Sequence, residues 1–331
     1  MNQELLSRLF KSIDGTKDES LVKIAFSIIQ DEKNKGHNNL ARKLERILEK
    51  NLSSTKPTQR LLKVTKDSEY YIPKDRRYNL PLATHVPREK LRHYMVLSPD
   101  MERKVSLIEQ EYAARDRLAK FGLHPRRKIL LYGPSGSGKS MTAERIAWNL
   151  GLPFFKVRFD TIISSYLGES ASNLNLLFKS LNEVPCVLLL DEFDIVAKRR
   201  GQNRNDIGEM DRIVNILLGL LEEFESDGLL FATTNLEGQL DNALFRRFDD
   251  LIEMGLPEAL QIRALLQMSL ESMVVDKDVD LNRLTELLDG NSSAQVVRMA
   301  QNAAKKSVIE GKSSVVMAHF IQVINEAKRI D

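Results

Sequence analysis

The sequence predicts an α/β fold: a parallel five-stranded sheet with helices on both faces, a helical C-terminal lid, and a small α-helical N-terminal domain. Two observations predict it. Short apolar segments alternate with amphipathic stretches in the middle of the chain, which is the pattern of a parallel sheet covered by helices. After Pro257 only helical periodicity remains, and residues 1–50 show the same helical spacing before the sheet begins.

The composition is that of a folded globular chain. Hydrophobic residues make up 42% and charged residues 29% of the 331 residues, which excludes a fully disordered or collagen-like protein. No apolar run approaches the length of about 18 residues that a membrane span needs. The first residues also lack the basic and apolar segments of a signal peptide, so we expect a soluble, cytoplasmic protein without membrane contact. The single Cys186 excludes an intrachain disulfide.

Residues 1–50 are predicted to form a small helical domain. Apolar residues recur at helical spacing over 21–29 and again over 40–48. A turn around Gly36 would join these helices in a hairpin that is too small for a robust core of its own. We therefore expect the hairpin to bind a partner or a substrate.

Residues 51–93 are predicted to be a basic linker. Four prolines interrupt this stretch, and no periodicity extends through it. It holds ten lysines and arginines against four acidic residues, a net charge of +6 in a chain whose total is +3. Tyr70, Tyr71 and Tyr78 lie among the basic residues. The segment is thus either a solvated connector, which is the favoured interpretation, or a strip that binds nucleic acid.

The sheet domain is assigned to residues 94–256 and the lid to residues 257–331. The strands of the sheet are predicted from short apolar segments bounded by turn-forming or amphipathic residues. These segments are Lys128–Tyr132, Phe154–Arg158, Val184–Leu190, Leu229–Thr233 and Leu251–Met254. The helices expected in the lid are Leu260–Ser272, Leu281–Leu288, Ala294–Ile309 and Val315–Ala327.

A glycine-rich loop follows the first predicted strand and precedes a helix-forming run. It reads Gly133-Pro134-Ser135-Gly136-Ser137-Gly138-Lys139-Ser140, with Met141 next, and this is the spacing of a phosphate-binding loop in its strand-to-helix context. The glycines let backbone N–H groups surround a triphosphate, toward which the following helix directs its positive end. Lys139 would place a charge between the terminal phosphates, and Ser140 would hold Mg²⁺. A chance match of a glycine–serine turn is the weaker alternative.

Two carboxylates, Asp191 and Glu192, follow the predicted strand Val184–Leu190. Mg²⁺ prefers oxygen ligands, and phosphoryl transfer to water needs a group that orients and polarises the water. Asp191 is suited to hold the Mg²⁺ shell with Ser140, and Glu192 to polarise the water that attacks the γ-phosphate. The two motifs together predict a site for a nucleoside triphosphate and Mg²⁺.

These two motifs, together with the further motifs described next, make the chain resemble the AAA family of ATPases over roughly residues 80–325. The resemblance implies that the nucleotide is ATP. It implies that Asn235 is the sensor-1 residue, whose amide lies between the acidic pair and the γ-phosphate. The segment Asp241–Asp249 is similar to the family segment that carries arginine fingers. Arg246 and Arg247 are therefore expected to act in the site of the next subunit, where they stabilise the charge on the transferred phosphoryl group.

The segment Tyr166-Leu167-Gly168 is similar to the family's pore loop. The resemblance implies that Tyr166 and Leu167 project into a central channel and grip an extended polypeptide. It also suggests a second, mobile loop over residues 199–206.

The lid carries a further likeness. Gly290–Gln295 is similar to the start of a helix in the family's lid but departs from the family pattern at Ser293 and Gln295. No arginine stands at the family's sensor-2 position, and Arg298 lies one turn further along. By resemblance Tyr94–Leu97 lines the adenine pocket, although its apolar residues could equally belong to the core.

The resemblance favours a protein-remodelling ATPase similar to katanin and spastin. It implies a homo-oligomer, hexameric in the family, that threads a protein substrate held by residues 1–50. The chain has no His-Glu-x-x-His motif, so proteolysis would come from a separate chain, for which a subtilisin-like serine protease is the candidate that related bacterial ATPases imply. Two alternatives are a nucleic-acid-linked ATPase that uses residues 51–93, and a nucleotide-gated scaffold. The intact catalytic residues count against the scaffold.

Overall fold

The computed structural model describes residues 70, 72–75, 78–163, 169–182, 184–193, 207–235 and 245–327, together with positions 29, 41 and 44. Two compact units divide the chain, Met1–Glu69 and Tyr70–Asp331. In the first unit the three described residues, Ile29, Ala41 and Leu44, are helical and buried. The rest of the predicted hairpin, and the linker up to residue 69, lie outside the described residues.

Among the described residues of the second unit, six strands form a sheet in the order β1-β3-β4-β5-β2-β6. The strands are β1 (Ala83–Val86), β2 (Lys128–Tyr132), β3 (Phe154–Val157), β4 (Val187–Leu190), β5 (Leu229–Thr234) and β6 (Asp250–Glu253). The five strands from β2 to β6 pair in parallel, as the sequence predicts.

The sixth strand corrects the predicted linker, which was expected to run to residue 93. Strand β1 pairs antiparallel with β3, so that Ala83 lies opposite Val157 and Val86 opposite Phe154. Four residues flanked by prolines give too short a signal for a sequence pattern to detect. Prolines are tolerated beside an edge strand because the unpaired edge needs no N–H donor there.

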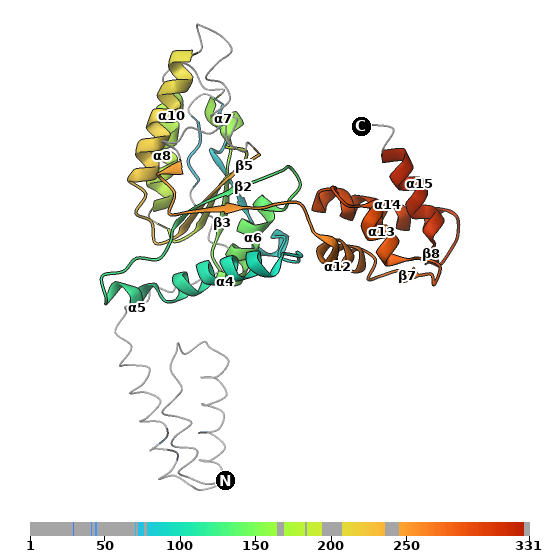
Figure 1. Cartoon of the computed structure of the whole chain (residues 1–331). Helices are drawn as coiled ribbons and strands as arrows, with labels where there is room; N and C mark the ends of the chain where they lie inside the picture. Colours follow the sequence, from blue (N-terminus) through green and yellow to red (C-terminus); the bar gives the residue numbers. More distant parts are fainter. Residues whose placement is uncertain are drawn as a thin grey trace. The chain divides into compact units, whose positions relative to one another are not determined.

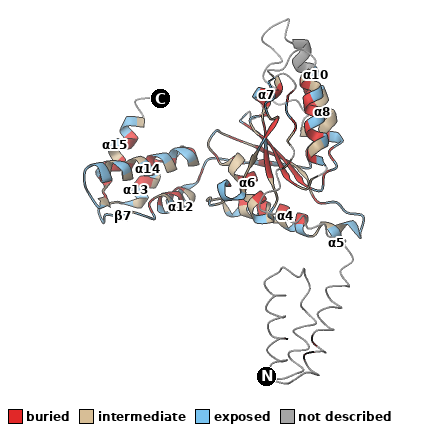
Figure 2. Ribbon diagram, turned by 180° about the vertical axis from the view of Figure 1, so that it is seen from behind, coloured by how far each residue is buried: buried red, intermediate tan, exposed pale blue. Residues whose placement is uncertain are grey.

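Helices cover both faces of this sheet (Figure 1). One face packs against α4 (Pro99–Ala113) and α6 (Lys139–Leu150), and the other against α8 (Glu169–Asn182) and α10 (Ile207–Glu222). The described part of the domain also contains the short helices α5 (Arg115–Ala119) and α7 (Phe159–Ile163) and the 3₁₀ turn η1 (Arg88–Lys90). Each central strand is therefore buried on both sides, as Figure 2 shows, which explains its continuous apolar sequence.

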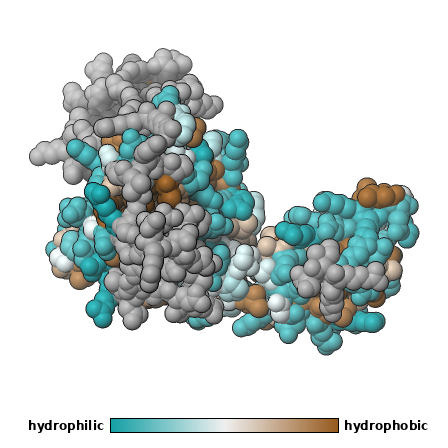
Figure 3. Space-filling model, turned by 90° about the horizontal axis from the view of Figure 1, so that it is seen from above, coloured by the Kyte–Doolittle hydropathy of each residue, from teal (hydrophilic) through white to brown (hydrophobic). Residues whose placement is uncertain are grey.

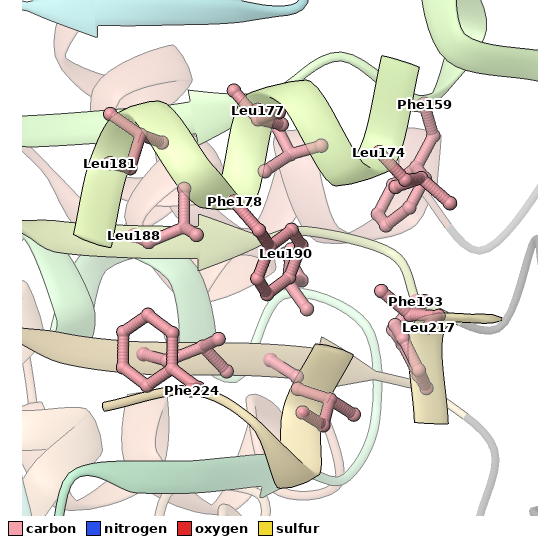
Figure 4. Packing of buried hydrophobic residues seen from close by; sticks show 14 of the residues in the cluster. Phe159, Leu174, Leu177, Phe178, Leu181, Leu188, Leu190, Phe193, Leu217 and Phe224 are labelled. Atoms are coloured by element: carbon pink, nitrogen blue, oxygen red, sulfur yellow. The ribbon is translucent and has the colours of Figure 1, made fainter. Parts of the chain in front are cut away.

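Alternate residues of each strand belong to different cores. In β4, Val187 and Leu189 contact the α4–α6 side, whereas Leu188 and Leu190 contact the α8–α10 side. Figure 4 shows this second core, in which Leu188 and Leu190 face side chains of α8 such as Phe178. The strands are held rigidly from both faces, and their carboxyl ends carry the polar residues of the site.

The lid is a four-helix domain with its own core. Its helices are α12 (Ala259–Ser269), α13 (Leu281–Leu287), α14 (Ser293–Ile309) and α15 (Met317–Ala327). The expectation that strands stop after Pro257 was wrong in one detail, because β7 (Val274–Val275) and β8 (Ser314–Val315) pair in parallel. Two residues per strand are too few to show a sequence period. Figure 3 shows a mostly hydrophilic surface over the lid, with hydrophobic side chains in separate groups.

Candidate nucleotide-binding site

The loop between β2 and α6 has the backbone of a phosphate cradle. Gly133 and Gly136 have φ angles of 137° and 78°, in the region that favours glycine. A Cβ atom on Gly133 would lie 2.2 Å from the carbonyl oxygen of Met254, and one on Gly136 would lie 2.7 Å from Oγ of Ser292. Both glycines are thus required by close packing as well as by backbone conformation.

Lys139, the first residue of α6, is buried and folds back over this loop. Its Nζ donates hydrogen bonds to the carbonyl oxygens of Gly133 at 2.8 Å and Pro134 at 2.7 Å. The ammonium group is therefore held at the mouth of the loop, where it can donate to a phosphate.

Asp191 lies at the carboxyl end of β4 and is the centre of a polar cluster. Its Oδ1 accepts hydrogen bonds from Ser140 Oγ and from Thr233 Oγ1, both at 2.6 Å, and its Oδ2 lies 2.5 Å from Lys156 Nζ. Burial raises the pKa of Asp191, but the hydrogen bonds from Lys156, Ser140 and Thr233 outweigh burial and hold that pKa below its ordinary value. Asp191 is therefore an anion.

The donor set at Ser140 and Asp191 fits Mg²⁺. A hydroxyl and a carboxylate oxygen meet at one point, and both are ligands of the hard type that Mg²⁺ prefers. Among the described residues no group of three His, Cys, Asp or Glu side chains is arranged to hold a metal. This is compatible with Mg²⁺, which keeps several waters and takes other ligands from the phosphates of a nucleotide.

Glu192 has an unusual backbone that turns the chain at the end of β4. Its φ angle is 52°, which costs about 1 to 3 kcal/mol for a residue other than glycine. The turn is held by Thr233, whose Oγ1 accepts a 3.0 Å hydrogen bond from the Glu192 N–H and whose carbonyl accepts one of 2.8 Å from Phe193. Strain of this kind is typical of functional sites, and Glu192 lines the pocket beside Asp191.

The pocket beside the loop has a volume of about 510 Å³, within the range of about 300 to 1,000 Å³ typical of ligand sites. It is lined by the loop and the ends of β4 and β5, by the segment before α4, and by the lid. The lining residues include Arg92, Tyr94, Met95, Val96, Ser135, Gly136, Ser137, Gly138, Lys139, Ser140, Met141, Asp191, Glu192, Thr233, Asn235 and Arg298.

Most of the predicted site residues therefore come together in one pocket. Of the segment Tyr94–Leu97, the first three residues line the pocket. Met95 and Leu97 also pack against the core on the α4–α6 side, and Val96 packs against the core of the lid. The apolar residues of the segment therefore belong to the cores, and a contact with adenine stays a prediction. Gly133 and Pro134 lie at the base of the loop, where their carbonyl groups accept from Lys139.

The lid contacts the loop directly. The Ala294 N–H, in the first turn of α14, donates a 3.0 Å hydrogen bond to the Gly136 carbonyl. Ser292 caps this helix and forms a reciprocal capping box with Gln295, whose Oε1 accepts from the Ser292 N–H at 2.8 Å. Gln295, which departs from the family pattern, therefore has a structural role at the helix start.

Sequence reasoning gave no role to several polar residues of the pocket, among them Thr233, Arg92 and Arg298. Thr233 is buried at the end of an apolar strand, and a polar residue in that position was the available signal. Arg92 was included in the basic linker, but its backbone and side chain donate to Glu144 of α6. Arg298 was given no role, yet α14 places it in the pocket lining.

Arg246 and Arg247 do not line the pocket of their own chain. Arg246 is exposed, while Nη2 of Arg247 lies 2.6 Å from Oε1 of Glu222 at the end of α10. The Nε of Arg247 is buried and has no hydrogen-bond partner among the described residues. The predicted pore loop at Tyr166-Leu167-Gly168 and the second loop at 199–206 lie outside the described residues.

The fold and the pocket define a class: a P-loop nucleotide-binding protein whose helical lid contacts the phosphate loop. Residues 129–256 match the family described as "ATPase family associated with various cellular activities (AAA)". An uncharacterized AAA family ATPase of Sinorhizobium fredii, y4kL, is 34% identical over 329 residues, which cover 98% of this chain and 95% of that protein. The chain therefore belongs to the AAA family and is an ATPase.

A second relative is the ATP-dependent zinc metalloprotease FtsH of Lancefieldella parvula. It is 32% identical over 215 residues, which cover 63% of this chain and 33% of FtsH. The chain thus spans about a third of the length of that relative and contains no His-Glu-x-x-His motif. No helix among the described residues is long and apolar enough to cross a membrane.

Proposed function

We propose that this AAA ATPase is a protein remodeller that assembles into a ring, hydrolyses ATP at the interfaces between subunits, and moves polypeptide through a central pore. The observation that carries the proposal is the placement of Arg246. It is exposed, it is absent from the lining of its own pocket, and it lies in the segment that resembles the family's arginine fingers. A site of this kind becomes complete when a neighbouring subunit supplies the arginine.

Within one subunit the residues have distinct tasks. The loop N–H groups and Lys139 bind the phosphates. Ser140 and Asp191 are the residues that would hold Mg²⁺, which would neutralise phosphate charge. Glu192 accepts a proton from the attacking water, and the Asn235 amide orients that water and the γ-phosphate. Arg246 and Arg247 of the adjacent subunit stabilise the charge that develops on the transferred group.

The remodelling step is assigned to Tyr166, Leu167 and Gly168, and the capture of substrate to residues 1–50. The similarity to FtsH, an ATP-dependent protease by name, supports a protein substrate. The proposed assembly is a hexamer. A protease partner, if coupled, belongs to a separate chain, and a subtilisin-like serine protease remains the proposed candidate.

The test is ATPase activity of the purified chain against its own concentration, with and without an unfolded protein, beside mass photometry in ATP. We expect specific activity to rise as rings form and to rise further with unfolded protein. Tyr166→Ala should remove the response to unfolded protein, whereas Tyr166→Phe should keep it. Activity that is independent of concentration in a chain that mass photometry shows to be a monomer would contradict the ring.

The nucleic-acid alternative rests on the charge of residues 51–93. Stimulation of hydrolysis by DNA alone, with an affinity that falls steeply as salt rises, would favour it over the remodeller.

A further inference from the structure

Lys156 is a lysine on β3 to which the sequence motifs give no task. Strand β3 lies beside β4, with Lys156 opposite Leu189, so its side chain reaches the residue that follows the neighbouring strand. Its Nζ lies 2.5 Å from Oδ2 of Asp191. The Asp191 side chain is 12% exposed, whereas that of Lys156 is 48% exposed. One partner is therefore fixed in the site and the other is free to move into solvent.

The two oxygens of Asp191 have different partners. Oδ1 accepts from the hydroxyl groups of Ser140 and Thr233, which are neutral donors. Oδ2 faces the ammonium group of Lys156, which is the one ion pair of Asp191 among the described residues. A cation drawn to this carboxylate thus meets a group whose charge is already neutralised by the protein itself.

We propose that Lys156 is an internal competitor of Mg²⁺ for Asp191, so that it sets the Mg²⁺ concentration above which nucleotide binds tightly. The inference rests on the proposed Mg²⁺–nucleotide site and makes Lys156 a positioning residue rather than a catalytic one. Lysine suits this task because its ammonium group is a compact charge on a flexible side chain. When the ammonium group moves away from Asp191, water hydrates it readily. Half-exposed ion pairs are weak, so the competition can be reversed by a divalent ion.

A purely structural role predicts something different. If Lys156 only stabilised the end of β4, removing it would lower stability and weaken Mg²⁺ binding together. Competition predicts tighter Mg²⁺ binding when the lysine is removed.

The experiment is an equilibrium titration of the full chain with Mg²⁺ at a fixed concentration of a fluorescent, non-hydrolysable ATP analogue. Lys156→Met removes the ammonium group, and Lys156→Arg keeps a cation. Arg158→Met is the matched control, because Arg158 lies two residues further on and pairs with Asp160 at 2.8 Å instead of Asp191. It removes the same charge from the neighbourhood without touching the site.

In Lys156→Met we expect the half-saturating Mg²⁺ concentration to fall about three- to fivefold, the effect of one exposed ion pair. It should stay within about twofold of wild type in the other two variants. Without nucleotide, Mg²⁺ should raise the melting temperature of Lys156→Met more than that of the wild type.

An unchanged or increased Mg²⁺ requirement in Lys156→Met would overturn the inference, and so would an equal shift in Arg158→Met, which would show an effect of net charge. If these results occur while the wild type binds nucleotide in a Mg²⁺-dependent way, the proposed function stands and only the role of Lys156 fails. A wild-type chain with no Mg²⁺-dependent binding would overturn both.

Discussion

The hydroxyl of Ser140 donates a 2.6 Å hydrogen bond to the carboxylate of Asp191, 51 residues further along the chain. Ser140 lies in the first turn of α6, directly after the phosphate loop, and Asp191 directly follows β4. The hydrogen bond therefore joins the phosphate loop to the carboxyl end of β4. Thr233, at the end of β5, donates to the same oxygen and also accepts from the N–H of Glu192. Two motifs that are separate in the sequence therefore form one site.

Replacing Glu192 with Gln is expected to slow ATP hydrolysis by about 10²- to 10⁴-fold, because an amide cannot accept the proton of the attacking water. ATP should still bind, since the loop and Lys139 are unchanged. Phosphate release and equilibrium ATP binding measure the two effects. The control is Glu223→Gln, an exposed carboxylate that follows α10 and should keep normal turnover. Normal turnover in Glu192→Gln would show that Glu192 does not polarise the attacking water.

Replacing Gly133 with Ala is expected to abolish ATP binding. The new Cβ would lie 2.2 Å from the Met254 carbonyl oxygen, and the φ angle of 137° is itself unfavourable for alanine. Isothermal titration with ATP measures the loss.

The matched variant is Gly219→Ala in α10, where a Cβ would meet nothing within 4 Å. It should bind ATP normally and stabilise the chain by about 0.5 to 1 kcal/mol, since alanine favours a helix over glycine. ATP binding by Gly133→Ala with wild-type affinity would contradict the close packing of the loop.

The pair of Glu111 and Arg126 predicts a dependence of stability on pH. Hydrogen bonds from Arg126 hold the pKa of Glu111 below its ordinary value, more than offsetting burial. Because the folded-state pKa lies below the unfolded-state value of about 4.3, this carboxylate adds stability above that value. The contribution is lost as the pH falls through the folded-state pKa.

Glu111→Gln should therefore be less stable than the wild type at neutral pH, by about 1 to 2 kcal/mol. The difference should narrow as the pH falls below about 4. Urea unfolding at a series of pH values measures it, and a difference that stays constant with pH would be evidence against the ion pair.

Replacing either of the two adjacent arginines with alanine should reduce ATPase activity, but the two variants should differ in their free energy of unfolding. Arg246 is exposed, so Arg246→Ala should change the unfolding free energy by less than about 0.5 kcal/mol and yet reduce ATPase activity by about 10³-fold. Arg247→Ala should lose activity too and also cost up to about 1 kcal/mol, since it gives up the ion pair with Glu222. Thermal melting and phosphate release separate the two effects.

The sequence predicts the elements of this fold that have long or strongly apolar patterns. The strand at Lys128–Tyr132 begins and ends as predicted, and the lid helix Ser293–Ile309 differs by one residue from the prediction. Strand β1 was missed because its four residues depend on pairing with β3, a contact between segments about 70 residues apart. Tertiary pairing of this kind leaves no local period.

In the site, residues with a fixed spacing could be predicted, and residues that reach the pocket from elsewhere could not. Lys139 and Ser140 belong to one continuous motif. Arg92 and Lys156 look like ordinary surface charges in the sequence, and only the packing of their segments brings them to Glu144 and Asp191.

The measurement that tests the central claim most directly is the ATPase activity of a mixture of two variants, Arg246→Ala and Glu192→Gln. Each is expected to be inactive alone, because one lacks the arginine and the other lacks the carboxylate that polarises water. In a mixed ring an Arg246→Ala subunit keeps Glu192 and receives Arg246 from its neighbour. We predict activity well above the sum of the separate proteins. A mixture no more active than that sum, while mass photometry shows rings, would contradict a site shared between subunits.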